Sequence, residues 1–143
     1  MPPLEPTALP AWEPGTVAIL STGAGAPHAI PVSTGVRAGP RTVLLALATR
    51  RESLGRLRRD ARCALTLLAA GDVAVTAHAR AVIVEDPMTV SDRVAAVRLD
   101  VEHVQDHGQD RFEIDRGVAW HWKDPEAERR DGEIRAALAA LAA

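Results

Sequence analysis

The chain of 143 residues contains no tyrosine, one phenylalanine, one lysine and one cysteine. The single cysteine, Cys63, excludes an intrachain disulfide and favours a reducing compartment, for which we predict the cytoplasm. No apolar run reaches the length of a membrane-spanning helix. The first residues, MPPLEPTALP, lack the basic start and apolar core of a signal peptide. We therefore expect a soluble cytoplasmic protein with no membrane partner.

Charge of either sign is not in large excess. Lysine and arginine total 17 against 19 acidic residues, which gives a formal net charge of −2 and no sign of a nucleic-acid partner. Hydrophobic residues make up 47% of the chain and charged residues 25%, the composition of a folded globular domain. Prolines crowd the first fifteen residues. We predict a proline-rich arm over residues 1–15 and a single domain over residues 16–143.

Apolar runs and alternating patterns predict about seven strands. The predicted strands are Thr16–Ser21, Pro27–Thr34, Thr42–Ala48, Ala61–Leu68, Val73–Val84, Val94–Gln105 and Arg111–Trp122. Gly35–Pro40 is expected to be a turn. Because proline cannot donate a ladder hydrogen bond, Pro31 predicts that its strand lies at a sheet edge or carries a bulge.

Two helices complete the expected fold. A short one begins near Ser53, between the third and fourth strands, and buries Leu54 and Leu57. A second opens at Asp124–Pro125 and runs to about Ala142, although Gly132 would be able to split it. Strands predominate, connections are short and helices do not alternate with strands. This pattern favours a mainly β fold, an antiparallel barrel that is closed or nearly closed.

Arginines gather where the third strand meets the short helix. Arg50 and Arg51 follow the strand, and Arg56 lies further along the helix. A helix N-terminus offers free N–H groups and arginine adds forked donors, so a phosphate site is one interpretation. A solvated basic helix face is the other, and the residues alone weigh the two about equally.

The pattern T-x-x-x-S-L-x-x-L-R-R-D-x-R-x-A-L after an apolar strand resembles the pyridoxamine 5′-phosphate oxidase-like, FMN-binding split-barrel family. The matching residues are Thr49, Ser53, Leu54, Leu57, Arg58, Arg59, Asp60, Arg62, Ala64 and Leu65. In strand order, the likeness extends from about Thr16 to Trp122. The resemblance implies a split β-barrel, a homodimer with FMN between its subunits, and hydride transfer through flavin N5 to or from a small-molecule substrate. A deazaflavin coenzyme is the alternative cofactor.

The resemblance also assigns the site residues. Family members hold the flavin phosphate at this strand–helix junction and meet the flavin ring edge with backbone groups of an earlier strand. One aromatic residue is expected to cover the ring from the partner subunit. The implied cofactor-binding residues are Ile30, Pro31, Val32, Ser33, Leu47, Ala48, Thr49, Arg50, Arg51, Ser53, Arg56 and Trp120. Many relatives carry a basic residue where Ser53 stands, so Arg50, Arg51 or Arg56 would have to supply that charge.

No residue stands out as a catalytic acid or base, which suits a flavin-dependent oxidoreductase whose cofactor performs the chemistry. A non-catalytic protein that binds a flavin or another anionic ligand is a second hypothesis, and a dimeric scaffold with a degenerate site is a third. His103 and His107 have the spacing of a helical metal pair but fall in a strand and a turn. We predict no metal site, and a packing role for Cys63.

Overall fold

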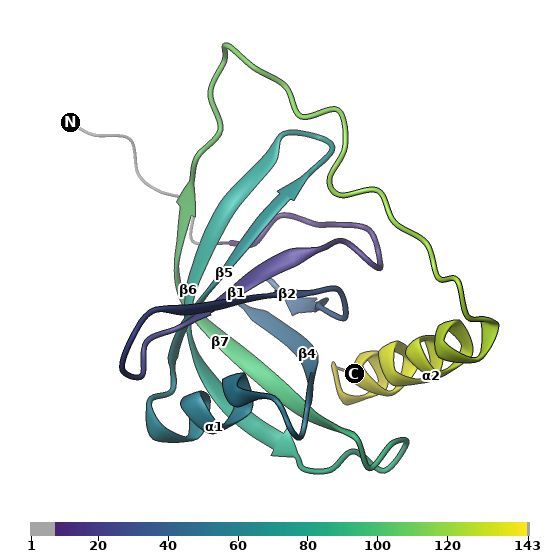
Figure 1. The fold of residues 1–143 in the computed structure, drawn as a ribbon. Coiled ribbons are helices and arrows are strands. Elements are labelled where there is room, and N and C mark those ends of the chain that lie inside the picture. Colours follow the sequence, from purple (N-terminus) through teal and green to yellow (C-terminus); the bar gives the residue numbers. More distant parts are fainter. Residues whose placement is uncertain (1–7, 143) are drawn as a thin grey trace.

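The computed structural model describes residues 8–142, which form one seven-stranded sheet and two helices (Figure 1). The elements are β1 (Ala18–Thr22), β2 (His28–Val32), β3 (Val36–Gly39), β4 (Thr42–Ala48), α1 (Glu52–Arg59), β5 (Arg62–Ala69), β6 (Val73–Glu85), β7 (Val94–Asp106) and α2 (Pro125–Ala142). The predicted mainly β class, the short helix between two strands and the C-terminal helix are confirmed.

The sheet curls into a barrel whose strand order is β2-β1-β5-β6-β7-β4-β3, with every neighbouring pair antiparallel. β2 and β3 are the two edges, and they are consecutive in the chain. The barrel is therefore joined at this seam by the short link of residues 33–35 and not by a ladder of hydrogen bonds. The prediction that Pro31 lies in an edge strand is confirmed.

Two predictions about strands are wrong. Gly35–Pro40, expected as a turn, contains strand β3, and the turn to β4 falls at Pro40–Arg41. Arg111–Trp122, expected as the last strand, has no regular secondary structure. It belongs to the long connection that runs from the end of β7 across the outside of the barrel to α2 (Figure 1).

The connection fails to form a strand because its polar contacts are isolated and form no ladder. The backbone N–H of Ile114 donates to Asp72 Oδ1, and the indole of Trp120 donates to the carbonyl of Gly15. Trp120 and Trp122 remain 38% and 37% exposed and pack edge to face at 5.3 Å. The alternating apolar residues that suggested a strand therefore make separate side-chain contacts and do not belong to a paired strand.

The main core fills the barrel interior. Leu20, Leu45, Leu65, Leu67 and Leu99 are almost completely buried there, and β4 is buried on both faces, as its unbroken apolar run predicts. The small inward-facing residues of β6 also lie in this core, which matches the predicted alternation of that strand.

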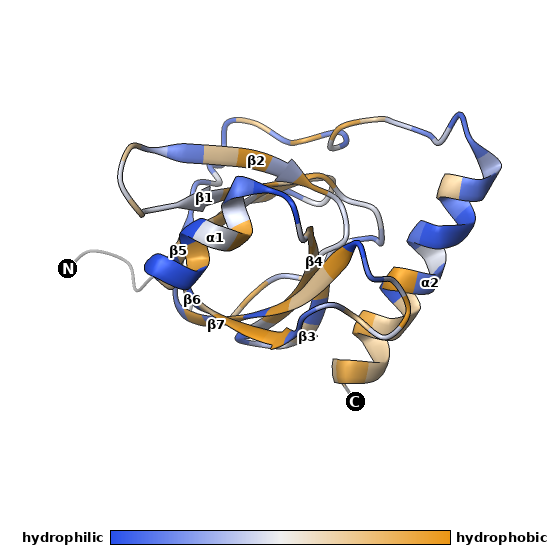
Figure 2. Cartoon of the chain, turned by 60° about the horizontal axis from the view of Figure 1, so that its bottom comes forward, coloured by the Kyte–Doolittle hydropathy of each residue, from blue (hydrophilic) through white to orange (hydrophobic). Residues whose placement is uncertain are grey.

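A second, smaller core lies outside the barrel, between β4 and α2. Its buried members are Leu44, Met88, Ala96 and Leu138. Figure 2 shows that α2 is hydrophilic along its first turns and hydrophobic toward its C-terminal end, which lies beside β3 and β4. Gly132 does not split the helix. Asp124 caps it, since its Oδ1 accepts the N–H of Glu126 at 3.0 Å.

Local chemistry accounts for the sharpest turn. Gly71 and Asp72 join β5 to β6 and both have positive φ, 81° and 62°. Three residues, 70–72, connect the paired residues Ala69 and Val73, and the positive φ angles of the last two let the chain reverse direction within this short loop. Of the predicted arm, residues 1–7 lie outside the described residues. Leu9 is buried in the barrel core, and the Trp12 indole donates to the carbonyl of Gly35.

No helix among the described residues combines the length and apolarity that crossing a membrane requires.

Candidate functional site

A groove of about 410 Å³ opens along the seam of the barrel, between β2, β4 and the side of α2. We call it the β2–β4 groove. Its lining residues are Ile30, Pro31, Val32, Ser33, Thr34, Ala46, Leu47, Ala48, Arg51, Ser91, Arg93, Val94, Trp122, Ala127, Arg130, Asp131 and Ile134. Its volume falls in the range of small-molecule sites.

The groove exists because the strand ladder stops there. β3 pairs with β4 only as far as Val36 opposite Leu44. One step further on, the Thr34 hydroxyl lies 3.0 Å from the N–H of Ala46 and 3.2 Å from its carbonyl, so a side chain continues the ladder. Beyond Ala46, no strand among residues 8–142 pairs with β4 on this side, and β2 is itself an edge. Edge strands present unpaired N–H and C=O groups, which a ligand in the groove can contact.

Three arginines border the apolar surface of the groove. Arg51 precedes α1, Arg93 precedes β7, and Arg130 lies on α2. Within residues 8–142, none of their guanidinium groups forms a hydrogen bond or ion pair. Unpaired guanidinium groups around an apolar surface suit a ligand with an apolar body and an anionic group.

The N-terminus of α1 adds to this positive character. Arg51 is its N-cap residue, and no side chain of residues 8–142 caps the first N–H groups of the helix. The short helix forms because Leu54 and Leu57 are buried against the barrel. Basic residues occupy its last turn, where they interact favourably with the negative end of the helix dipole. The strand–helix junction therefore has free donors on the groove side.

Asp131 is the one carboxylate among the groove-lining residues. It is 8% exposed, and its Oδ2 lies 2.8 Å from Nε of Arg135 one turn further along α2. This pairing offsets the charge of Asp131, which leaves the groove with a net positive character.

The structure brings seven of the twelve residues predicted from the family resemblance into the β2–β4 groove. They are Ile30, Pro31, Val32, Ser33, Leu47, Ala48 and Arg51. Five others do not line it. Of these, Thr49 donates to the carbonyl of Arg93, Arg50 is exposed in the turn before α1, and Trp120 contacts Gly15.

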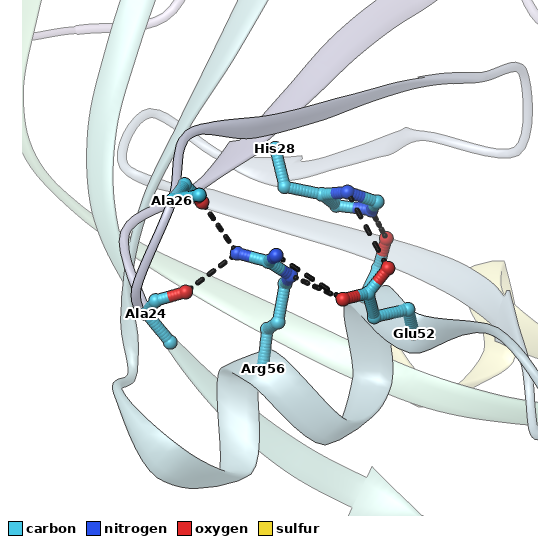
Figure 3. A network of polar contacts seen from close by, with 6 residues as sticks. Ala24, Ala26, His28, Glu52 and Arg56 are labelled. Carbon is cyan, nitrogen blue, oxygen red and sulfur yellow. Dashed lines mark hydrogen bonds and ion pairs between the residues drawn. The ribbon is translucent and has the colours of Figure 1, made fainter.

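Ser53 and Arg56, the remaining two, belong to a polar network beside the groove. Figure 3 shows Arg56, Glu52 and His28 of this network. Ser53 is fully buried, and its Oγ lies 3.1 Å from Nε2 of His28. Arg56 donates to the carbonyls of Ala24 and Ala26 and pairs with Glu52. These contacts occupy two of the side chains that the family resemblance places at the flavin phosphate.

The order Glu52, His28, Ser53 invites comparison with a hydrolytic triad, but the geometry does not support one. The separation of 3.8 Å between His28 Nδ1 and Glu52 Oε2 exceeds hydrogen-bond length. Ser53 has no exposed surface through which to reach a substrate. Within the described residues there is also no cluster of potential metal ligands.

Sequence reasoning missed Arg93, Arg130, Asp131 and Trp122 as groove residues. Arg93 lies in a connection to which no structure was assigned, and the α2 residues are about eighty positions from β4 in sequence. The sequence of α2 does contain a weak indication that this helix packs beside a site. Asp131 and Arg135 have i, i+4 spacing and stand beside the apolar stripe that begins at Ile134.

The chain matches no protein-family model, and no curated protein sequence matches it. Solved structures do match. One is a protein from Clostridium acetobutylicum related to general stress protein 26 of B. subtilis, of the pyridoxinephosphate oxidase family. Its identity is 13% and the TM-score 0.53, over 69% of this chain and 86% of that one.

Two further structures bear the names of cofactor-dependent proteins. An F420 reductase shares 11% identity with a TM-score of 0.58, covering 75% of this chain and all of its own. A FAD-binding protein from Mesorhizobium loti shares 13% identity with a TM-score of 0.51, covering 62% of this chain and 83% of its own. At these identities the likeness establishes the fold. The predicted resemblance to the pyridoxamine 5′-phosphate oxidase-like split barrel is confirmed at that level.

Proposed function

We propose that the β2–β4 groove binds a flavin-type cofactor, FMN, and that the protein is a flavin-dependent oxidoreductase acting on a small-molecule substrate. The observation that carries this proposal is the combination of an apolar groove with three unpaired guanidinium groups at its border. The structural likeness to proteins named for FAD and F420 agrees with it.

Each part of the groove has a role in this proposal. Ile30, Leu47 and Val94 offer apolar surface to a flat ring, and the free edges of β2 and β4 offer N–H and C=O groups to the ring's polar rim. Arg51 and Arg93 hold the phosphate together with the N-terminal N–H groups of α1. When bound, the flavin supplies hydride transfer at N5, and the protein orients it and excludes water.

A deazaflavin coenzyme is the alternative cofactor. Arg130 is a third cation on the α2 wall of the groove, in addition to Arg51 and Arg93. A cofactor whose tail carries more negative charge than a single phosphate would use all three, whereas FMN would leave one of them unpaired. Comparing the affinity of Arg130→Ala for the two cofactors separates them, because only a deazaflavin tail is expected to lose affinity.

The test is a titration followed by visible absorbance, with the double variant Arg51→Ala/Arg93→Ala against Arg50→Ala. Arg50 is a neighbouring arginine that does not line the groove, so it controls for a general loss of positive charge. We expect the double variant to weaken FMN binding by about a hundredfold or more, since each of the two charge-assisted hydrogen bonds contributes about 1.5–3 kcal/mol. Arg50→Ala is expected to bind as the wild type does.

Equal affinity of the double variant and the wild type would refute the phosphate assignment. Absence of binding by the wild type, with FMN and with a deazaflavin, would refute the cofactor proposal. If flavin binds but no electron donor reduces it in the protein, the hypothesis of a non-catalytic flavin-binding protein replaces that of an oxidoreductase.

We also propose that the protein is a homodimer. Ile19 on β1 and Leu68 on β5 point outward from neighbouring strands and are 40% and 54% exposed. Apolar groups on adjacent strands are often covered by a second subunit. Sedimentation equilibrium tests this, and a monomer at micromolar concentration would contradict it.

A further inference from the structure

The Arg56 side chain joins two separate segments of the chain at one point. Its Nη1 donates to the carbonyls of Ala24 and Ala26 in the β1–β2 loop, at 2.5 and 2.7 Å. Its Nε donates to Glu52 Oε1 at 3.1 Å, one turn earlier on α1. The side chain is 11% exposed, so these contacts form largely out of solvent. Figure 3 shows the guanidinium group between the loop and the helix.

A second contact lies beside the first. His28, the first residue of β2, is hydrogen-bonded through Nε2 to the buried hydroxyl of Ser53 on α1. The β1–β2 loop and the beginning of β2 are thus both tied to α1 by buried or half-buried polar contacts. Within residues 8–142, no backbone hydrogen bond joins β2 to α1, so side-chain contacts provide the polar connection between them.

Both segments continue into the β2–β4 groove. β2 leads from His28 to Ile30 and Val32 on the groove wall, and α1 begins at Arg51 on the groove border. In the part of the chain that the structure describes, no strand lies beside the outer edge of β2. Its position relative to Arg51 therefore depends on what holds the loop and the helix together.

We propose that Arg56 is a positioning residue, which holds the edge of β2 in a fixed position relative to Arg51. The apolar wall that β2 forms then stays at a constant distance from the arginine at the groove border. The effect on cofactor binding rests on the proposed function, whereas the effect on β2 does not. A preformed site loses less conformational entropy on binding because no loop has to become ordered, and it therefore binds its ligand more tightly.

Arginine is suited to this role in a way that lysine is not. The planar guanidinium group presents several donors in fixed directions, so it satisfies two carbonyls and a carboxylate together. A lysine ammonium group on a flexible stem cannot reproduce that arrangement. We therefore expect Arg56→Lys to recover little of what Arg56→Ala loses.

The matched control is Arg59, on the same helix. Arg59 is exposed, and its side chain forms no hydrogen bond or ion pair within residues 8–142. Arg59→Ala removes the same charge from α1 without touching the loop.

The experiment compares Arg56→Ala, Arg56→Lys and Arg59→Ala by amide hydrogen exchange without ligand and by FMN titration, well below the unfolding temperature of every variant. We expect faster exchange over residues 23–33 in both Arg56 variants, with the remaining strands unchanged. We expect FMN to bind them about tenfold more weakly, because the loop and strand must then be ordered on binding. Arg59→Ala should match the wild type in both measurements.

Exchange over residues 23–33 that stays at the wild-type rate in Arg56→Ala would overturn the proposal. So would an unchanged FMN affinity, because a role limited to overall stability lowers the unfolding temperature without weakening binding by the folded protein. If wild-type protein binds neither FMN nor a deazaflavin, the proposed function fails, and the exchange measurement alone decides the positioning role. Should Arg56→Ala not fold, Arg56→Lys and Glu52→Gln carry the same test.

Discussion

At the scale of single residues, Ser53 shows how strongly burial limits what a position can do. Its side chain has no exposed surface, and its hydroxyl contacts His28. The family resemblance leads us to expect a basic residue at this position in many relatives. A longer side chain at this fully buried position would have to displace the residues packed around it.

We therefore expect Ser53→Lys to destabilise the protein and not to create a phosphate site. Burying an unpaired ammonium group should cost about 3 kcal/mol or more, whereas Ser53→Ala should cost about 1 kcal/mol for the lost hydrogen bond. Urea unfolding gives both values. A Ser53→Lys protein as stable as the wild type, with tighter FMN binding, would contradict this expectation.

Cys63 is the second residue whose chemistry follows from burial. Its Sγ contacts the carbonyl of Ala79 at 3.7 Å, and burial raises the pKa of the thiol from 9.0 to about 12. The thiolate is the reactive form, so the folded protein should react slowly with iodoacetamide at pH 8. The packing role predicted for Cys63 agrees with its place in the barrel core.

The same pKa shift has a consequence for stability. Below pH 9 the thiol is neutral in both states. Between pH 9 and about 12 the unfolded chain loses the proton and the folded chain keeps it. The free energy of unfolding should then fall by up to about 1.4 kcal/mol per pH unit. Urea unfolding of wild type and Cys63→Ala over this range checks it. Identical slopes for the two proteins would show that Cys63 does not contribute.

At the scale of elements, we expect replacement of glycine by alanine to have opposite effects on stability at two positions. A Cβ at Gly55 in α1 would meet no atom within 4 Å, but a Cβ at Gly117 would lie 2.7 Å from the backbone oxygen of Leu68. Gly55→Ala should stabilise the protein by about 0.5–1 kcal/mol through helix propensity. Gly117→Ala should destabilise it by about 1–3 kcal/mol because the connection must move away from β5. Thermal unfolding of both variants tests the pair, and a shift in the same direction for both would contradict it.

The elements also show what the sequence can predict. β4 was placed without error and β1, β2, β5, β6 and β7 within about two residues, because buried runs and period-two alternation are local signals. The segment from Arg111 to Trp122 has similar alternation but forms no strand, since forming one requires a partner edge elsewhere in the chain. The short strand β3 was hidden by the glycines at positions 35 and 39, which suggested a turn.

The candidate site also contains some residues that the sequence predicts and others that it does not. β2, β4 and Arg51 lie near one another in the family pattern, and the structure places them in one groove. Arg93 and Arg130 reach it from a connection and from α2, so only the tertiary fold brings them together. Arg56 and Ser53 have the residue types of a phosphate site, but the β1–β2 loop and His28 occupy them, and no sequence pattern reports such contacts.

At the scale of the whole molecule, α2 closes one side of the groove and depends on the small outer core to stay there. Leu138 is fully buried against Leu44 and Met88, whereas Leu141, almost one turn later, is 40% exposed. Leu138→Ala should therefore cost about 2–5 kcal/mol and weaken FMN binding, because the α2 wall of the groove, which includes Ile134, loosens. Leu141→Ala should change both by little. Chemical unfolding and FMN titration test the pair, and equal losses in the two variants would disprove the role of the outer core.

The edge position of Pro31 has a consequence for solubility. A free strand edge can pair with the same edge of another molecule, and repeated pairing leads to aggregation. β2 is such an edge, and Pro31 in its middle lacks the N–H group that a continuous intermolecular ladder would use. Proline at this position keeps the seam of the barrel open to small ligands while making it a poor template for further strands.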